Sequence, residues 1–198
     1  MNEEKTEQLI LVCQKGDVEA VARIVEEGAD VNGTDPSGKT ALMCAAQHGF
    51  ADTARFLIDS GADVNAKNNR GQSAVAYACR NDQVGALRLL LSRGADPDAP
   101  DVDGGSVMNF AACKGYMETV RVLVENGADI NVRDNEGNTP LMCAINNKFA
   151  GIINYLIARN TDLKVANKHN KTAMDLAREK NLMRVVTDLK FRLAEQQR

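Results

Sequence analysis

Hydrophobic and polar positions follow a repeating pattern along this chain. Short apolar stretches such as 41–46 and 140–145 are each followed by a second segment. In that second segment, for example 118–124, apolar residues recur at the spacing of an amphipathic helix. A glycine then stands where a helix would end, at Gly28, Gly61, Gly94 and Gly127. The pattern predicts pairs of short helices joined by turns.

The pattern repeats every 33 residues. Gly-Ala-Asp recurs at 28–30, 61–63, 94–96 and 127–129, and Asn160-Thr161-Asp162 continues the series. A hydroxyl residue, predicted to cap the first helix of each pair, recurs at Thr40, Ser73, Ser106, Thr139 and Thr172. A residue that tolerates a left-handed backbone precedes it at Gly38, Gly71, Gly104, Gly137 and Asn170. An apolar column runs through Leu9, Leu42, Val75, Met108, Leu141 and Met174. The chain is therefore a tandem repeat.

One copy carries a recognisable motif. Residues 134–144 read Asp-Asn-Glu-Gly-Asn-Thr-Pro-Leu-Met-Cys-Ala, with Pro140 at the first helical position. This segment and the period resemble the ankyrin repeat. The resemblance implies an all-α solenoid in which each unit is a helix-turn-helix followed by a β-turn or hairpin loop. It implies one domain over 1–198, divided into an N-terminal cap 1–34, internal repeats 35–67, 68–100, 101–133 and 134–166, and a C-terminal cap 167–198.

Several positions depart from the ankyrin motif. Its histidine is replaced by Met43, Ala76, Asn109 and Met142. The glycine of the turn between the paired helices is replaced by Asp82, Lys148 and Asn181. We expect these units to be locally less stable, with the repeat array still intact.

Composition narrows the class of protein further. The 198 residues include 24 basic and 27 acidic side chains, for a net charge of -3, which argues against broad phosphate binding and a nucleic-acid partner. Aromatic residues make up only 4%, which disfavours a sandwich or barrel core. No apolar run approaches the roughly 20 residues of a membrane-spanning helix, and the acidic start is not a secretory signal. We expect no membrane partner.

The five cysteines match neither a disulfide framework nor a zinc pattern. Unpaired cysteines favour a reducing compartment, and we expect a cytoplasmic protein. Cys44 and Cys143 share a column with Tyr77, Phe110 and Leu176 and are predicted to be core. Cys13 and Cys79 fall where alanine stands in other copies. Cys113 shares a column with polar residues, so we predict that it is exposed and is the one reactive thiol, with no evident resolving partner.

Residues Gly33–Thr40 match the pattern of a nucleotide-binding P-loop. That loop requires a preceding buried strand and a long following helix, whereas here a turn precedes it and a short helix follows. The repeat already accounts for Gly38 and Thr40. The two histidines, His48 and His169, lie too far apart in the sequence to share a site in a solenoid. We expect no catalytic residues, no metal and no cofactor.

The ankyrin resemblance implies a binding face on the concave side, made of the turn tips and the exposed side of the first helices. Carried onto this chain, the residues expected to bind a partner are Lys39, His48, Lys67, Asn69, Arg70, Gln72, Arg80, Asn81, Val102, Asp103, Lys114, Arg133 and Glu136. The charge of this face leans positive around Lys67, Arg70 and Arg80. We expect an acidic protein segment to bind there, although the face shows few aromatic anchors.

The functional prediction is a non-enzymatic protein-binding module, monomeric on its own, that acts as an adaptor or as an inhibitor. One alternative is an immunity protein that protects its own cell by occluding a hydrolase. A less favoured alternative is a nucleotide-binding switch that uses Gly33–Thr40. The sequence does not encode the identity of the partner.

Overall fold

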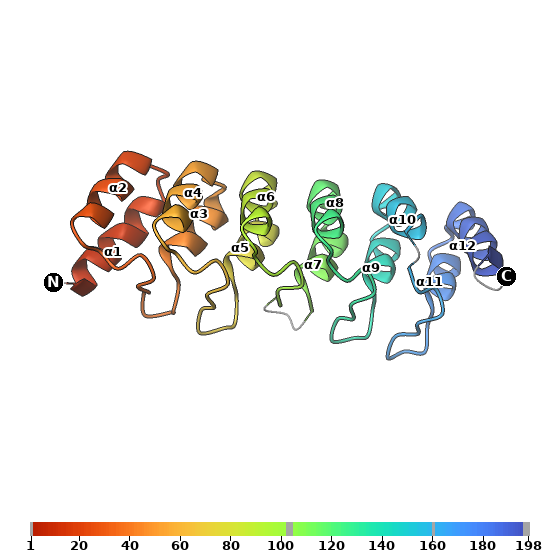
Figure 1. Cartoon of the computed structure of the whole chain (residues 1–198). Coiled ribbons are helices and arrows are strands. Elements are labelled where there is room, and N and C mark those ends of the chain that lie inside the picture. Colours follow the sequence, from red (N-terminus) through yellow and green to blue (C-terminus); the bar gives the residue numbers. More distant parts are fainter. Residues whose placement is uncertain (1, 102–104, 160, 196–198) are drawn as a thin grey trace. The chain divides into compact units, whose positions relative to one another are not determined.

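A computed structural model describes residues 2–101, 105–159 and 161–195 (Figure 1). These residues form twelve α-helices and two isolated antiparallel bridges, Thr34 with Thr40 and Ala166 with Thr172. The chain comprises two compact units, Met1–Val102 and Asp103–Arg198. The expectation that six repeats with the predicted boundaries act as one domain stays a prediction.

Each unit holds six helices in three consecutive pairs. In the first unit they are α1 (Asn2–Cys13), α2 (Val18–Glu26), α3 (Ala41–His48), α4 (Ala51–Asp59), α5 (Ala74–Arg80) and α6 (Val84–Ser92). In the second they are α7 (Val107–Lys114), α8 (Met117–Glu125), α9 (Pro140–Asn146), α10 (Ala150–Ile157), α11 (Ala173–Glu179) and α12 (Met183–Glu195). Each member of a pair packs on the other, and each first helix also packs on the first helix of the next pair in its unit.

The repeated apolar positions form the core of each unit. Leu9, Leu42 and Val75 are at most 1% exposed in the first unit, and Met108 and Leu141 are fully buried in the second. Small residues stand where the first helices approach each other, because Ala45, Ala78, Ala111 and Ala144 are also fully buried. The predicted apolar column is thus a packing column, and burial of that surface is the main favourable term for the stacked helices.

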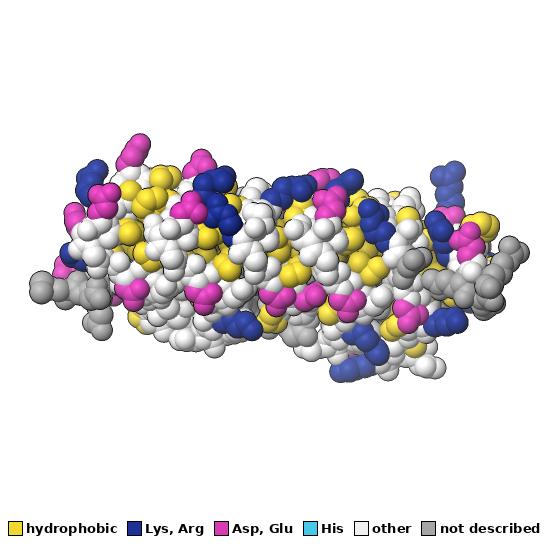
Figure 2. Space-filling view, viewed as in Figure 1, with side chains coloured by type: hydrophobic (Ala, Val, Ile, Leu, Met, Phe, Trp, Pro, Cys, Tyr) yellow, Lys and Arg dark blue, Asp and Glu magenta, His cyan; other side chains and the backbone are white. Residues whose placement is uncertain are grey.

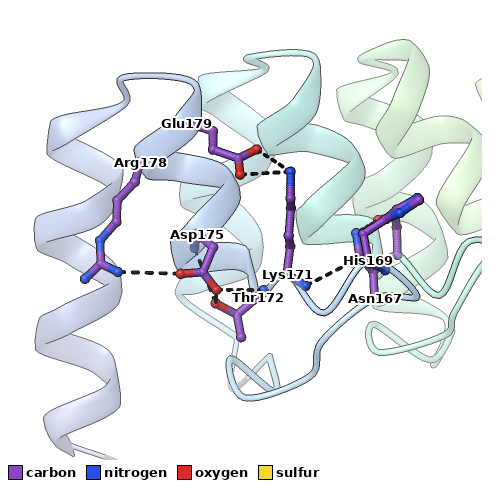
Figure 3. Close-up of polar contacts among 8 residues, drawn as sticks. Asn167, His169, Lys171, Thr172, Asp175, Arg178 and Glu179 are labelled. Carbon is purple, nitrogen blue, oxygen red and sulfur yellow. Dashed lines mark hydrogen bonds and ion pairs between the residues drawn. The ribbon is translucent and has the colours of Figure 1, made fainter.

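The hydroxyl column caps the first helices as predicted. The Thr40 hydroxyl accepts a hydrogen bond from the amide of Met43 at 3.2 Å. The same bond, from the amide three residues later in the chain, is accepted by the hydroxyls of Ser73, Ser106, Thr139 and Thr172. Figure 3 shows the last of these caps, where the Asp175 carboxylate also accepts hydrogen bonds from the amide and hydroxyl of Thr172, at 3.0 and 2.6 Å. The hydroxyl bond lowers the pKa of Asp175. Each cap fixes where its helix begins.

The turn before each capped helix also has the predicted backbone. Gly38 and Gly137 have φ of 78° and 75°, and Asn170 has φ of 56°. In the last copy the Asn167 carboxamide oxygen accepts hydrogen bonds from the amides of His169 and Lys171, at 3.0 and 3.1 Å (Figure 3). Gly104 lies outside the described residues.

The turn between paired helices is left-handed even where glycine is missing. Asp82, Lys148 and Asn181 have φ of 52°, 61° and 58°. A side chain with a β-carbon is strained in this region by about 1–2 kcal/mol. The repeat geometry therefore imposes this conformation on Lys148, which does not favour it, whereas asparagine and aspartate, as at Asn181 and Asp82, tolerate it better.

Asparagines at the end of each repeat tie consecutive turns together. In the first unit Asn32 donates to the carbonyl of Gly61 at 3.0 Å and accepts from the amide of Asp63 at 2.8 Å. Asn65 makes the same two bonds to Gly94 and Asp96, at 3.2 and 3.0 Å. Because each side chain bonds an acceptor 29 residues ahead and a donor 31 residues ahead, the repeats keep a fixed register.

Candidate protein-binding face

The turn tips of the first unit enclose a polar hollow of about 410 Å³, which we call the turn-tip hollow. Its lining residues are Ser37, Asn68, Asn69, Arg70, Gln72 and Tyr77. Asn69 closes one side, because its amide donates to the carbonyl of Ser37 at 3.0 Å and its carboxamide donates to the carbonyl of Pro36 at 3.1 Å. Two consecutive repeats thereby build one site.

Tyr77 is the aromatic centre of this hollow. Its hydroxyl accepts a hydrogen bond from the carboxamide of Asn68 at 3.0 Å, and the Lys39 ammonium lies 4.8 Å from the centre of its ring. That ammonium also donates to the carboxamide oxygen of Gln47. The sequence placed Tyr77 in a core column, yet the side chain is only half-buried. The sequence signal for this exposure was the large polar-tipped tyrosine in a column that otherwise holds Cys44, Phe110, Cys143 and Leu176.

Fewer cationic side chains are available to a partner on this face than the sequence suggested. Arg80 donates two hydrogen bonds of 2.8 Å to the two carboxylate oxygens of Asp101, a residue only 7% exposed. Lys67 and Arg70 are exposed, and no acidic residue in the described part of the chain lies within ion-pair distance of either. The charge available to a partner in the first unit is therefore centred on Lys67 and Arg70, and Arg80 is committed to Asp101.

The remaining predicted residues of the first unit occupy different environments. His48 is exposed and stacks on Phe50 with ring centres 5.9 Å apart, and Asn81 is exposed while donating to the carbonyl of Tyr77 at 2.9 Å. The expectation that Gln72 faces solvent is wrong, because it is 6% exposed. Its carboxamide oxygen accepts from Asn68 at 3.2 Å, so it supports the wall of the hollow.

The second unit carries three of the predicted residues at its surface. The Lys114 ammonium lies 5.6 Å from the centre of the half-buried Phe110 ring. Arg133 is exposed but donates to the carbonyls of Gly137 and Ala166 at 3.2 and 2.8 Å. Glu136 lies 3.4 Å from the imidazole Nε2 of His169. Val102 and Asp103, also predicted, lie outside the described residues.

Aromatic anchors are more available than the sequence suggested. Tyr77 in the first unit and Phe110 in the second are half-buried, and each has a lysine ammonium near its ring. A half-buried ring offers large apolar area at little cost in side-chain entropy. These two half-buried rings are therefore candidate anchors beyond the residues that the sequence indicated.

The loop that matches the P-loop pattern is a turn closed on its own carboxylate. One Asp35 carboxylate oxygen accepts from the amides of Ser37 and Lys39, at 2.8 and 2.9 Å, and the amide of Gly38 donates to the Asp35 carbonyl at 2.8 Å. Desolvation raises the pKa of Asp35, but hydrogen bonds from the Ser37 hydroxyl and from the amides of Lys39 and Ser37 outweigh it and lower the pKa overall. A phosphate would need those amides and would meet a carboxylate instead, so the geometry disfavours nucleotide binding.

Four of the five cysteines are core residues, as predicted. Cys13, Cys44 and Cys79 are fully buried, and Cys143 is 2% exposed. Cys113 is half-buried rather than fully exposed. It is also not isolated, because its thiol shares a hydrogen bond with the thiol of Cys143.

Other kinds of site find no support in the described residues. Within residues 2–101, 105–159 and 161–195, no three or more histidine, cysteine or acidic side chains gather so that they could hold a metal ion. None of the described helices has the length and apolarity to cross a membrane. Over the second helix of each pair, the face shown in Figure 2 carries interspersed acidic and basic side chains.

Stacked helix pairs, left-handed turns and a polar face at the turn tips define an all-α repeat protein. A family model of ankyrin repeats (three copies) matches residues 9–101 and 108–190. The chain therefore belongs to the ankyrin repeat family, whose members are generally protein–protein interaction modules. No curated protein matches the chain.

Proposed function

We propose that this chain binds a protein partner through the turn tips and first helices, and that an acidic segment of the partner is bound at the turn-tip hollow. The observation that carries the proposal is the exposed Arg70, which lines the hollow with the half-buried Tyr77, together with the exposed Lys67 in the same turn. Neither cation has an acidic ion-pair partner among the described residues. Such a charge pair steers an acidic segment by long-range attraction, and the ring adds apolar contact once the segment is seated.

We further propose that binding has an adaptor or an inhibitory role in the reducing cytoplasm. The four buried, unpaired cysteines are consistent with such a compartment. Occlusion of a hydrolase by an immunity protein would use the same face and would differ only in the partner.

The test compares two double charge reversals. K67E/R70E alters the proposed site, and R23E/R55E makes the same change in net charge on the second helices α2 and α4. Arg55 is exposed and its pairing with Asp52, at 3.9 Å, contributes little to stability. Arg80 is left intact because its loss would leave Asp101 buried without a cation. Circular dichroism melts establish that both variants fold.

Each protein is used to capture partners from the source cells, and captured proteins are quantified by mass spectrometry. We expect a partner that the parent protein and R23E/R55E both retain. Its affinity for K67E/R70E should be weaker by a factor of about ten or more. Equal capture by all three proteins would show that the interface does not include the turn-tip hollow. One enzyme captured stoichiometrically and inhibited would identify an inhibitor, whereas several non-enzymatic proteins would identify an adaptor.

A further inference from the structure

Two cysteines from consecutive repeats of the second unit lie side by side. Cys113 is at the C-terminal end of α7 and Cys143 is in α9, and these two first helices pack directly on each other. A side-chain hydrogen bond joins the thiols of Cys113 and Cys143. Cys143 is 2% exposed, whereas Cys113 is half-buried and open to small solutes. One thiol of the pair is thus accessible, and its neighbour is protected.

Polar groups surround the pair. The Cys143 thiol donates to a carboxylate oxygen of Asp134 at 3.8 Å, and the Asn109 side chain also hydrogen-bonds this thiol. Lys114 follows Cys113 directly in the sequence and contributes a nearby positive charge. The bond between the two thiols lowers the pKa of the Cys113 thiol and raises that of Cys143. The accessible sulfur is therefore the better nucleophile, because the thiolate is the reactive form.

A second pair, Cys13 and Cys44, shows what this arrangement adds. Both residues are fully buried in the first unit. Burial, reinforced by the neighbouring Cys44, raises the pKa of Cys13 to about 12. Neither of these two thiols is accessible to solvent, so this pair provides an internal comparison.

We propose that Cys113 and Cys143 form a peroxide-reactive site, in which Cys113 is oxidised first and Cys143 resolves the product as an intramolecular disulfide. In the first step the Cys113 sulfur attacks a hydroperoxide, the O–O bond breaks and an S–O bond forms. The sulfur is oxidised to a sulfenic acid, and the peroxide is reduced to water or an alcohol.

In the second step the Cys143 sulfur attacks the sulfenic sulfur of Cys113. An S–S bond forms, the S–O bond breaks, and the hydroxyl leaves as water with the Cys143 proton, for which the Asp134 carboxylate is the nearby acceptor. The two thiols and one peroxide thus give one disulfide, one molecule of water from the second step, and one molecule of water or alcohol from the first. A cellular dithiol or glutathione would reverse the reaction.

Closure requires the two sulfurs to come into bonding distance. The hydrogen-bonded sulfurs must approach to about 2.05 Å in the disulfide. Cys113 stands one residue before the end of α7, and Gly115 follows in a left-handed turn with φ of 80°. The inference stands independently of the proposed partner binding.

The direct test oxidises the purified full-length protein with a small excess of hydrogen peroxide at neutral pH. We expect the intact mass to fall by two hydrogens and a non-reducing digest to contain one linked peptide pair, Cys113 with Cys143. Dithiothreitol should restore the original mass and all five thiols.

Variants separate the two roles. In Cys143→Ala, the sulfenic acid on Cys113 should accumulate and be trapped by dimedone, and no disulfide should form. In Cys113→Ser, consumption of peroxide by the protein should slow at least about tenfold, because the remaining thiols are buried. Cys44→Ala occupies the equivalent position in another repeat and should oxidise like the parent. Melts by circular dichroism verify that each variant folds, and Cys143→Ser is the second choice if Cys143→Ala does not.

Three results would overturn the proposal. One is oxidation of Cys113 to a sulfinic acid in the parent protein without a bond to Cys143. Another is a disulfide that joins Cys113 residues of two molecules. The third is an unchanged rate of peroxide consumption in Cys113→Ser.

Discussion

At the scale of single residues, the backbone conformation of the repeat determines which residue types fit without strain. The turn between paired helices is left-handed at Gly16, Gly49 and Gly115, and also at Lys148. Lys148 is exposed, and its conformation follows from the turn and not from a contact of its side chain. A substitution that relieves this strain should therefore act on stability alone.

We predict that Lys148→Gly stabilises the protein by roughly 0.5–1 kcal/mol. Relief of the left-handed strain outweighs the added chain entropy of glycine in the unfolded state. Urea unfolding followed by circular dichroism measures the difference. Lys148→Ala removes the same charge and keeps the β-carbon, so it should show no gain; equal stabilisation by both would mean that charge, not backbone strain, is responsible.

A second residue-scale prediction concerns the thiol of Cys113. The hydrogen bond with Cys143 favours the Cys113 thiolate, so the pKa of Cys113 lies below the ordinary 9.0. Loss of this bond in Cys143→Ala should raise that pKa. At pH 7, alkylation of Cys113 by iodoacetamide should therefore be slower in Cys143→Ala, and the midpoint of the rate-against-pH curve should move to higher pH. An unmoved midpoint would show that the hydrogen bond does not set the reactivity.

At the scale of elements, one ion pair fastens the end of α5 to the turn that follows α6. The Asp101 side chain is 3% exposed and the Arg80 side chain 30%, and their contact is bidentate at 2.8 Å. A buried carboxylate without its cation is costly, so this pair fixes the connection more by the penalty of breaking it than by its net strength.

We predict that Arg80→Ala destabilises the protein by about 2 kcal/mol, because Asp101 would stay buried and unpaired. The double variant R80A/D101A should recover part of the loss, since neither charge then remains. Urea unfolding of the two single variants and the double variant gives the coupling energy. Strict additivity would show that the two side chains do not stabilise each other.

At the scale of the whole molecule, the open question is whether the two units unfold together. The contacts divide the described chain at residue 102, yet the 33-residue period runs on without change from Ser73 to Ser106 and Thr139. Stability in repeat proteins is a sum over repeats and their neighbour interfaces. An unbroken period favours one array.

We therefore predict a single urea transition for the full chain, monitored by circular dichroism at 222 nm. In Arg80→Ala, which alters only the first unit, the whole curve should move to lower urea. A two-step curve in which one step alone moves would make the units independent and would contradict the single repeat domain expected from the sequence.

The repeat, its helix pairs and its caps could be read from the sequence because they depend on local rules. The Thr40 and Ser73 caps and the left-handed Gly38 and Asn170 follow from residue type and spacing. Burial of Cys44 and Cys143 followed from their column. Each repeat of a periodic sequence carries the same local signals, so one copy that departs from the pattern does not obscure them.

Pairings between side chains of different repeats depended on the tertiary structure. The sequence determined an ankyrin repeat fold, because its motifs recur with the period, whereas the binding face that it indicated stays a prediction. Only the structure decided that Arg80 is engaged by Asp101, that Gln72 is buried, and that Tyr77 reaches the surface. It also placed Cys113 against Cys143. These pairings depend on the distance between side chains 21 to 30 residues apart, which helix packing sets and local sequence does not.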